Sequence, residues 1–254
     1  MAITIKSERE IELMAEAGKI LERVHNELEN ALRPGMSTKD IDTLGEEIIR
    51  SYGCMPSFLN YNGYPASICV SVNQEVVHGI PDKHRIIQEG DIVSLDAGVI
   101  YKGYHSDAAR THAVGEVSEE AKKLIQVTKE SFFEGIKFAK AGNHLFDISG
   151  AIGRYAEERG YGVVRDLCGH GIGTALHEAP EIPNYEVGRK GVRLRPGMTL
   201  AIEPMINIGT HEVDWLDDDW TVVTRDGSLS AHYENTILIT EGEPRILSLT
   251  CENE

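Results

Sequence analysis

Apolar residues recur at helical spacing in four stretches of the chain. In the first stretch they fall every three or four residues, at Ile11, Met14, Ala17, Leu21, Val24, Leu28 and Leu32. Ser7 and Glu10 form a capping box that predicts the start of this helix, and Pro34 with Gly35 predicts its end. We expect further helices over about 38–52, from near 118 to about 139, and over about 145–159.

Short stretches rich in β-branched residues lie between and after these helices. They are SICVSV (67–72), DIVSLDAGV (91–99), GVVRDLC (162–168), MTLAIEP (198–204), WTVVT (220–224) and YENTILIT (233–240). Two helices followed by strands, with the order repeated once, predict an α+β fold in which helices of both halves pack on one curved antiparallel sheet. No linker divides the chain, so we expect one domain, with halves of about 7–115 and 116–245.

A faint internal repeat supports the two halves. Five residues, three of them glycines, have an identical partner 107 positions later, although chance matches are easy among 25 glycines. The same register places Asp96 over Glu203. The second acid of each half does not follow this 107-residue register, because Glu234 follows Glu203 by 31 residues and Asp107 follows Asp96 by only 11. We interpret the surplus as a loop, which contains Trp215, Asp217, Asp218, Asp219 and Trp220.

Composition narrows the class of protein. Of the 254 residues, 41% are apolar and 26% are charged, as in ordinary globular proteins. The formal net charge of −16 argues against nucleic acid as a partner, because phosphate binding needs clustered lysine and arginine. The four cysteines form no C-x-x-C pair, so we expect neither a disulfide framework nor a zinc ribbon. With no signal peptide or membrane span in the sequence, the expected location is the reducing cytoplasm.

The segment SLDAGVIYKGYHSDAAR carries two acids in a predicted hairpin. A turn centred between Tyr101 and Lys102 would make Asp96 and Asp107 direct cross-strand partners on one face, with Cβ atoms ~5 Å apart. Carboxylates at that distance repel each other unless a cation lies between them. We therefore interpret the two aspartates as metal ligands.

Further donors follow downstream. CGHGIGTALHEAP contains His170 and His177, TLAIEPM contains Glu203, and HYENTIL contains Glu234. An oxygen-rich set with one or two imidazoles suits Mn, Fe, Co or Zn in a paired site, and it does not suit a cysteine-based structural zinc. Two such ions can activate a water and stabilise a tetrahedral intermediate.

Five segments together resemble a known family. They are NGYPASICVSVNQEVVHGIP (62–81), LDAGVIYKGYHSDAART, CGHGIGTALHEAPEIPNY, GMTLAIEPM and AHYENTIL. In these segments the chain resembles the type I methionine aminopeptidases, which have the pita-bread fold. The resemblance implies removal of the N-terminal methionine from nascent proteins, by hydrolysis of the first peptide bond with a hydroxide that bridges two metal ions. It implies two divalent ions per chain (Co, Mn, Fe or Zn) and five ligands: Asp96, Asp107, His170, Glu203 and Glu234.

The same resemblance implies roles around the metals. Glu203 would also accept a proton, and His78 and His177 would contact the substrate. The substrate pocket would be formed by Phe58, Tyr61, Tyr64, Cys69 and Trp220. Two positions depart from the commonest bacterial pattern, since Phe58 stands where a small residue is frequent and Leu176 stands where an aromatic residue is frequent.

The resemblance also bears on partners and on rival functions. It implies nascent polypeptide N-termini as partner and a monomeric protein, without membrane or nucleic acid; transient ribosome contact stays open. An X-Pro aminopeptidase or prolidase of the same fold usually carries an extra N-terminal domain, for which residues 1–6 leave no room. A non-catalytic pita-bread binding module is expected to have lost ligands, and all five are present. Glu203 follows His177 by 26 positions, which cannot hold the insertion of the type II enzymes, so a short bacterial or organellar form is expected.

Overall fold

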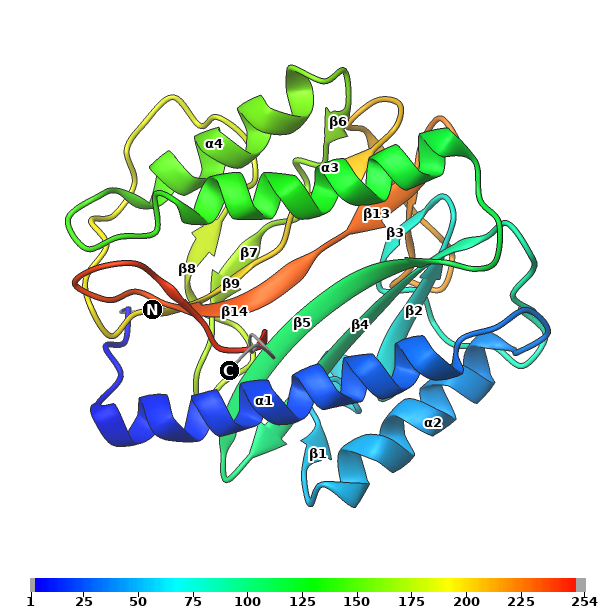
Figure 1. The fold of residues 1–254 in the computed structure, drawn as a ribbon, viewed down its shortest axis with the longest axis horizontal. Helices are drawn as coiled ribbons and strands as arrows, with labels where there is room; N and C mark the ends of the chain where they lie inside the picture. Colours follow the sequence, from blue (N-terminus) through cyan, green and yellow to red (C-terminus); the bar gives the residue numbers. More distant parts are fainter. Residues whose placement is uncertain (1–2, 250–254) are drawn as a thin grey trace.

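Helices from both halves cover one side of a curved sheet (Figure 1). The computed structural model describes residues 3–249. Within them lie four α-helices and one short 3-10 helix: α1 (Glu8–Ala31), α2 (Thr38–Ser51), η1 (Tyr61–Gly63), α3 (Glu119–Ile136) and α4 (Leu145–Glu157). Each α-helix lies where the sequence predicts one, and each half contributes two. None of the helices in residues 3–249 combines the length and the apolar character needed to cross a membrane.

The first helix shows how local sequence fixes the layers. The predicted capping box forms, because Ser7 N donates to Glu10 Oε2 at 2.7 Å and Glu10 N donates to Ser7 Oγ at 3.4 Å. The apolar side of α1 is fully buried at Met14, Leu21 and Val24. Burial of each such side chain stabilises the fold by roughly 1.5–3 kcal/mol. The helix is thereby fixed against the sheet.

The main sheet is antiparallel and runs without a break across both halves. Its order is β1-β4-β5-β14-β9-β7-β8, with β2 paired to β4 and β15 paired to β14. The strands are β1 (Met55–Pro56), β2 (Ile68–Val72), β4 (Ile92–Tyr101), β5 (Tyr104–Ala113), β7 (Gly169–Gly171), β8 (Glu178–Ile182), β9 (Thr199–Ile202), β14 (Glu234–Leu238) and β15 (Arg245–Ile246). The two halves meet at the β5–β14 pair, where Glu234 lies opposite Ala109.

Two small sheets correct the prediction of a loop between Glu203 and Glu234. The first has the order β13-β10-β6 and the second has the order β11-β12-β3. Their strands are β3 (Glu75–Val77), β6 (Gly162–Val163), β10 (Met205–Asn207), β11 (Val213–Trp215), β12 (Val222–Thr224) and β13 (Ser230–His232). Part of the surplus therefore forms strands, because Val213 and Val222 bury their side chains against Val76 and Val77. The turn between β11 and β12 contains Asp217, Asp218, Asp219 and Trp220, as predicted. We predicted that the helices pack on a single sheet. They cover the main sheet, and α3 and α4 also contact the small sheet β13-β10-β6.

The register of the β4–β5 hairpin also differs from the prediction. Its turn consists of Lys102 and Gly103, with φ of 48° and 86°, and Tyr101 pairs with Tyr104. Positive φ at both central residues is the geometry of a tight two-residue hairpin turn. The turn centre is therefore one residue later than predicted, so that Asp96 lies opposite Ala109 and Asp107 lies opposite Gly98. The prediction that the two aspartates lie directly opposite each other is wrong.

Buried apolar side chains form one large cluster in each half. The first joins α1 and α2 to β2 and β4, and the second joins α3 and α4 to β9 and β14. This matches the element order expected from the repeat. Cys54, Cys69 and Cys168 are free thiols, as predicted, and Cys251 lies outside the described residues.

Candidate metal centre and its pocket

Strand alternation turns the acids away from the helices. Val93, Leu95, Ala97 and Val99 of β4 belong to the cluster under α1 and α2, so Asp96 between them points to the opposite face. Ala108 of β5 belongs to the same cluster, and Asp107 next to it therefore faces the same way as Asp96. The two acids share a face after all, as diagonal neighbours.

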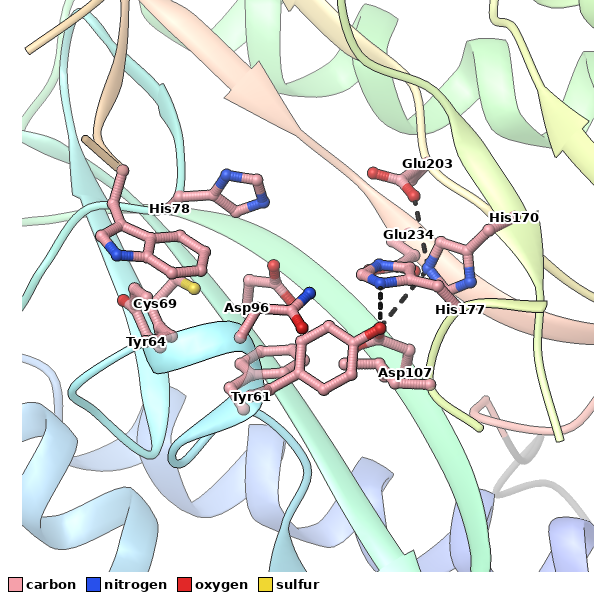
Figure 2. A pocket seen from close by; sticks show the side chains of 14 residues that line it. Tyr61, Tyr64, Cys69, His78, Asp96, Asp107, His170, His177, Glu203 and Glu234 are labelled. Atoms are coloured by element: carbon pink, nitrogen blue, oxygen red, sulfur yellow. Dashed lines mark hydrogen bonds and ion pairs between the residues drawn. The ribbon is translucent and has the colours of Figure 1, made fainter. Parts of the chain in front are cut away.

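A pocket of about 120 Å³ opens on that face and brings the predicted residues together (Figure 2). All twelve predicted site residues line it: Phe58, Tyr61, Tyr64, Cys69, His78, Asp96, Asp107, His170, His177, Glu203, Trp220 and Glu234. Leu176 and Asn62 complete the lining. The residues come from both halves, so the pocket lies where the halves meet.

The potential metal ligands lie on adjacent strands. Asp107 on β5, His170 on β7 and Glu234 at the start of β14 each offer a ligand atom, and these three atoms lie within 4.8 Å of one another. Glu203 directly follows β9, and its Oε1 lies 3.7 Å from His170 Nε2. Asp96 on β4 lines the same pocket. These distances are short enough for a single cation to contact several of the side chains.

His170 presents one nitrogen to the acids. Its Nδ1 donates a hydrogen bond to the Gly171 carbonyl at 2.9 Å, which fixes the ring and leaves Nε2 unprotonated. Nε2 lies 3.8 Å from Asp107 Oδ2. Burial, and next the proximity of His177, lowers the pKa of His170 to about 3. The imidazole is therefore neutral, as a metal-binding histidine must be.

The acids of the pocket are buried without enough partners. Burial raises the pKa of Asp96 to about 7. Burial first, and neighbouring carboxylates second, raise the pKa values of Asp107, Glu203 and Glu234 well above the usual range. Asp96 Oδ1, Asp107 Oδ1 and Glu234 Oε1 have no hydrogen-bond partner. Four carboxylates, three of them with an orphaned oxygen, and one neutral imidazole fit bound divalent cations, which would offset this repulsion.

Aromatic and sulfur side chains form the other wall of the pocket. The rings of Tyr64 and Trp220 meet edge to face with centroids 5.1 Å apart, and the buried Cys69 lies beside them (Figure 2). The Tyr64 hydroxyl donates to the Gly79 carbonyl at 3.0 Å, so its polar end is satisfied away from the pocket. The wall therefore offers an apolar surface.

Two further histidines, His78 and His177, line the pocket. His78 directly follows β3 with a φ of 59°, a backbone conformation that non-glycine residues rarely adopt. Burial, and next the proximity of His177, lowers the pKa of His78 to about 4. His177 lies on the exposed loop between β7 and β8, and its Nδ1 is 2.8 Å from the Tyr61 hydroxyl (Figure 2). Its ring meets that of His170 edge to face, with centroids 4.2 Å apart.

Some neighbours of the site are absent from the sequence prediction. Asn62 lines the pocket with a φ of 51°, and the Asn62-Gly63 pair is a turn signal that could have drawn attention to it. His232 Nε2 lies 3.7 Å from Glu203 Oε2, and Asn184 Nδ2 donates to the Glu203 carbonyl at 3.0 Å. Arg110 donates to the Glu234 carbonyl. The last three lie within segments that carry the family resemblance, but their contacts with Glu203 and Glu234 arise from tertiary structure and were not predicted.

Comparison with known proteins agrees with this geometry. The sequence profile of metallopeptidase family M24 matches residues 12–241. A methionine aminopeptidase from Clostridium acetobutylicum is 57% identical over 250 residues, which are 98% of this chain and 100% of that protein. The crystal structure of a methionine aminopeptidase from Thermotoga maritima has a TM-score of 0.96 at 47% identity, covering 98% of this chain and 100% of the other.

A second branch of the family is more distant. An Xaa-Pro dipeptidase from Bacillus anthracis has a TM-score of 0.78 at 27% identity, and this chain covers 63% of its length. The fold prediction, α+β with pita-bread architecture, is confirmed by both likenesses. The chain therefore belongs to metallopeptidase family M24, and within it to the methionine aminopeptidases.

Proposed function

We propose that this protein removes the N-terminal methionine of nascent polypeptides by hydrolysing the first peptide bond at a centre of two divalent ions. One observation carries the proposal. Four buried carboxylates and a neutral imidazole line the same pocket as an apolar wall of aromatic and sulfur side chains. The carboxylates and the imidazole suit metal-assisted hydrolysis, and the apolar wall suits a methionine side chain.

Five residues would hold the ions. They are Asp96, Asp107, His170, Glu203 and Glu234. The close grouping of Asp107, His170 and Glu234 supports this assignment. Mn, Fe, Co and Zn all accept such a set of oxygen and nitrogen donors. Bound there, the ions would lower the pKa of a coordinated water and polarise the scissile carbonyl.

The apolar wall would select methionine. The apolar part of the pocket is lined by Phe58, Tyr64, Cys69, Leu176 and Trp220. A flexible thioether gains favourable contacts with aromatic rings there, and it displaces water from the scissile bond. The nearby Tyr61 would close the pocket at its mouth.

The histidines and Glu203 would handle protons and hydrogen bonds. Because the Tyr61 hydroxyl can donate to Nδ1 of His177, the ring proton stays on Nε2 and can be donated to the substrate. His78, whose lowered pKa keeps it neutral, would donate a second hydrogen bond. These donors favour the charge that develops on the substrate oxygen in the transition state. Glu203 would accept the proton of the attacking water at a carboxylate oxygen.

We further propose a single domain that acts as a monomer in the cytoplasm. The sheet that continues from one half to the other supports the single domain. Transient ribosome contact remains a prediction. Lys122 and Lys137 on α3 are paired with Glu119 and Glu134, which favours a solvated helix face.

The discriminating experiment offers the metal-loaded protein two peptides. We expect release of methionine from Met-Ala-Ser and no cleavage of an Ala-Pro peptide of equal length. Cleavage of the Ala-Pro peptide without cleavage of Met-Ala-Ser would contradict the proposal and favour an X-Pro peptidase.

A further inference from the structure

The segment before α1 is held against the loop that carries His177. We call residues 172–178 the His177 loop. Lys6 N donates to the Gly197 carbonyl at 2.8 Å, which aligns the segment beside the start of β9. The Lys6 side chain then turns inward, and only 4% of it is exposed. A lysine buried to this degree requires a partner.

That partner is Glu178, the residue after His177. Lys6 Nζ lies 2.6 Å from Glu178 Oε2, and the Thr4 hydroxyl donates to the same oxygen at 2.6 Å. The other carboxylate oxygen accepts from Ala175 N at 3.3 Å. Glu178 therefore joins the N-terminal segment to the backbone on both sides of His177.

The loop is shaped to receive the ion pair. A Cβ atom on Gly173 would lie 2.4 Å from Lys6 Cε and 2.5 Å from Glu178 Oε1, so a side chain at this position would displace the pair. His105 N donates to the Gly173 carbonyl at 2.8 Å, which ties the loop to β5. The pair thus packs directly on the backbone of the loop.

His177 itself has few contacts that could hold it. Its side chain is exposed, and it contacts the hydroxyl and the ring of Tyr61 and the ring of His170. The position of its imidazole therefore depends on the backbone between the buried Leu176 and Glu178. The helix that follows does not need Lys6, because α1 has its own cap at Ser7.

We infer that the buried Lys6–Glu178 ion pair positions His177 for the reaction. Lys6 and Glu178 are positioning residues, since neither lines the pocket and both act through the loop. The inference rests on the proposed role of His177 in substrate binding. An error of about 1 Å in the position of such a group can lower catalysis about 100-fold.

A double-mutant cycle with His177 tests the inference. We expect Lys6→Met to lower kcat/KM for Met-Ala-Ser about 10- to 100-fold, mainly through kcat, with unchanged metal content. In a His177→Ala background, Lys6→Met should change kcat/KM less than about twofold, because the residue through which it acts is missing. An equal loss in both backgrounds would overturn the inference and indicate a purely structural role.

A matched control and a second readout separate this inference from the proposed function. Lys19→Met breaks an exposed ion pair with Glu16 on α1, at 2.8 Å, and should leave kcat/KM unchanged. Hydrogen exchange should accelerate in residues 172–178 of Lys6→Met and not in β4 or β5, whether or not the protein is active. Unchanged exchange in the loop would contradict the positioning role, whereas an inactive wild type would contradict the proposed function alone. If Lys6→Met does not fold, Glu178→Gln, which keeps the shape of the side chain, serves in the same cycle.

Discussion

Asp96 and Asp107 are diagonal neighbours across the β4–β5 hairpin, with Ala109 opposite the first and Gly98 opposite the second. The residue opposite each acid is small, and at Gly98 the absence of a side chain lets Ser57 and Phe58 pack against the strand. Both acids point away from the helices and into the pocket. The offset therefore keeps the two carboxylates on one face of the hairpin without placing them directly opposite each other.

The hydroxyl of Tyr61 is expected to set the orientation of His177. Tyr61→Phe removes the contact of 2.8 Å with Nδ1 and keeps the ring. A hydrogen bond of this kind contributes about 1 kcal/mol, so kcat/KM should fall about fivefold. Steady-state kinetics with Met-Ala-Ser would measure this fall in kcat/KM. Tyr52→Phe is the control, because it removes an exposed hydrogen bond to Glu27 and should leave kcat/KM unchanged; equal losses in the two variants would contradict the role of Tyr61.

Trp220 is expected to bind the methionine side chain. Trp220→Ala removes a wall of the pocket and the edge-to-face contact with Tyr64. Because the change removes apolar contact with the substrate, KM should rise about tenfold or more, while metal content stays the same. Trp215→Ala on the same hairpin, where 49% of the side chain is exposed, is the matched control. If Trp215→Ala raises KM as much, the assignment of the pocket is wrong.

His25 is expected to make the stability depend on pH. It is buried under the sheet, where Nε2 donates to the Ala108 carbonyl at 2.8 Å. Burial, and next the charges of Arg110 and His112, lowers its pKa well below the ordinary value of 6.5. As the pH falls, His25 is therefore protonated in the unfolded chain before it is protonated in the folded protein. The stability that neutral His25 contributes above pH 6.5 is lost as the pH falls below this value.

The size of this effect follows from the linkage of protonation to folding. At pH 5.5 the His25 contribution to the free energy of unfolding should be lower by about 1.4 kcal/mol than at neutral pH. Urea unfolding of the wild type and of His25→Leu at the two pH values measures it. The pH dependence should be smaller in the variant, and an identical pH dependence in both proteins would show that His25 does not titrate on unfolding.

Sequence patterns predict local features of this fold well and tertiary ones less well. The α1 capping box and the apolar spacing from Met14 to Leu28 specify the helix without reference to the rest of the chain. The β4–β5 turn could not be placed to the residue, because Lys102 takes a positive φ that its side chain does not reveal. The strands between Glu203 and Glu234 are three residues long, too short for an alternating pattern to be recognised.

The candidate site likewise contains residues that sequence patterns predict and residues that they do not. Residues within motifs, such as Asp107 and His170, were predicted and lie in the pocket. Asn184 and His232 also lie in segments that resemble the family, but their contacts with Glu203 arise only in the folded chain and could not be predicted from those segments. The pairing of Lys6 with Glu178 joins positions 172 residues apart and is visible only in the structure.

The central claim is that the buried acids hold two catalytic metal ions, and Asp107 tests it most directly. The metal-free wild type should regain release of methionine from Met-Ala-Ser as Mn, Fe, Co or Zn is added, and reach its maximum near two bound ions per chain. Asp107→Ala should bind fewer ions, measured by mass spectrometry after dialysis, and should show no turnover, whereas the exposed control Asp217→Asn should behave as the wild type. An Asp107→Ala protein that binds two ions and releases methionine at the wild-type rate would contradict the account.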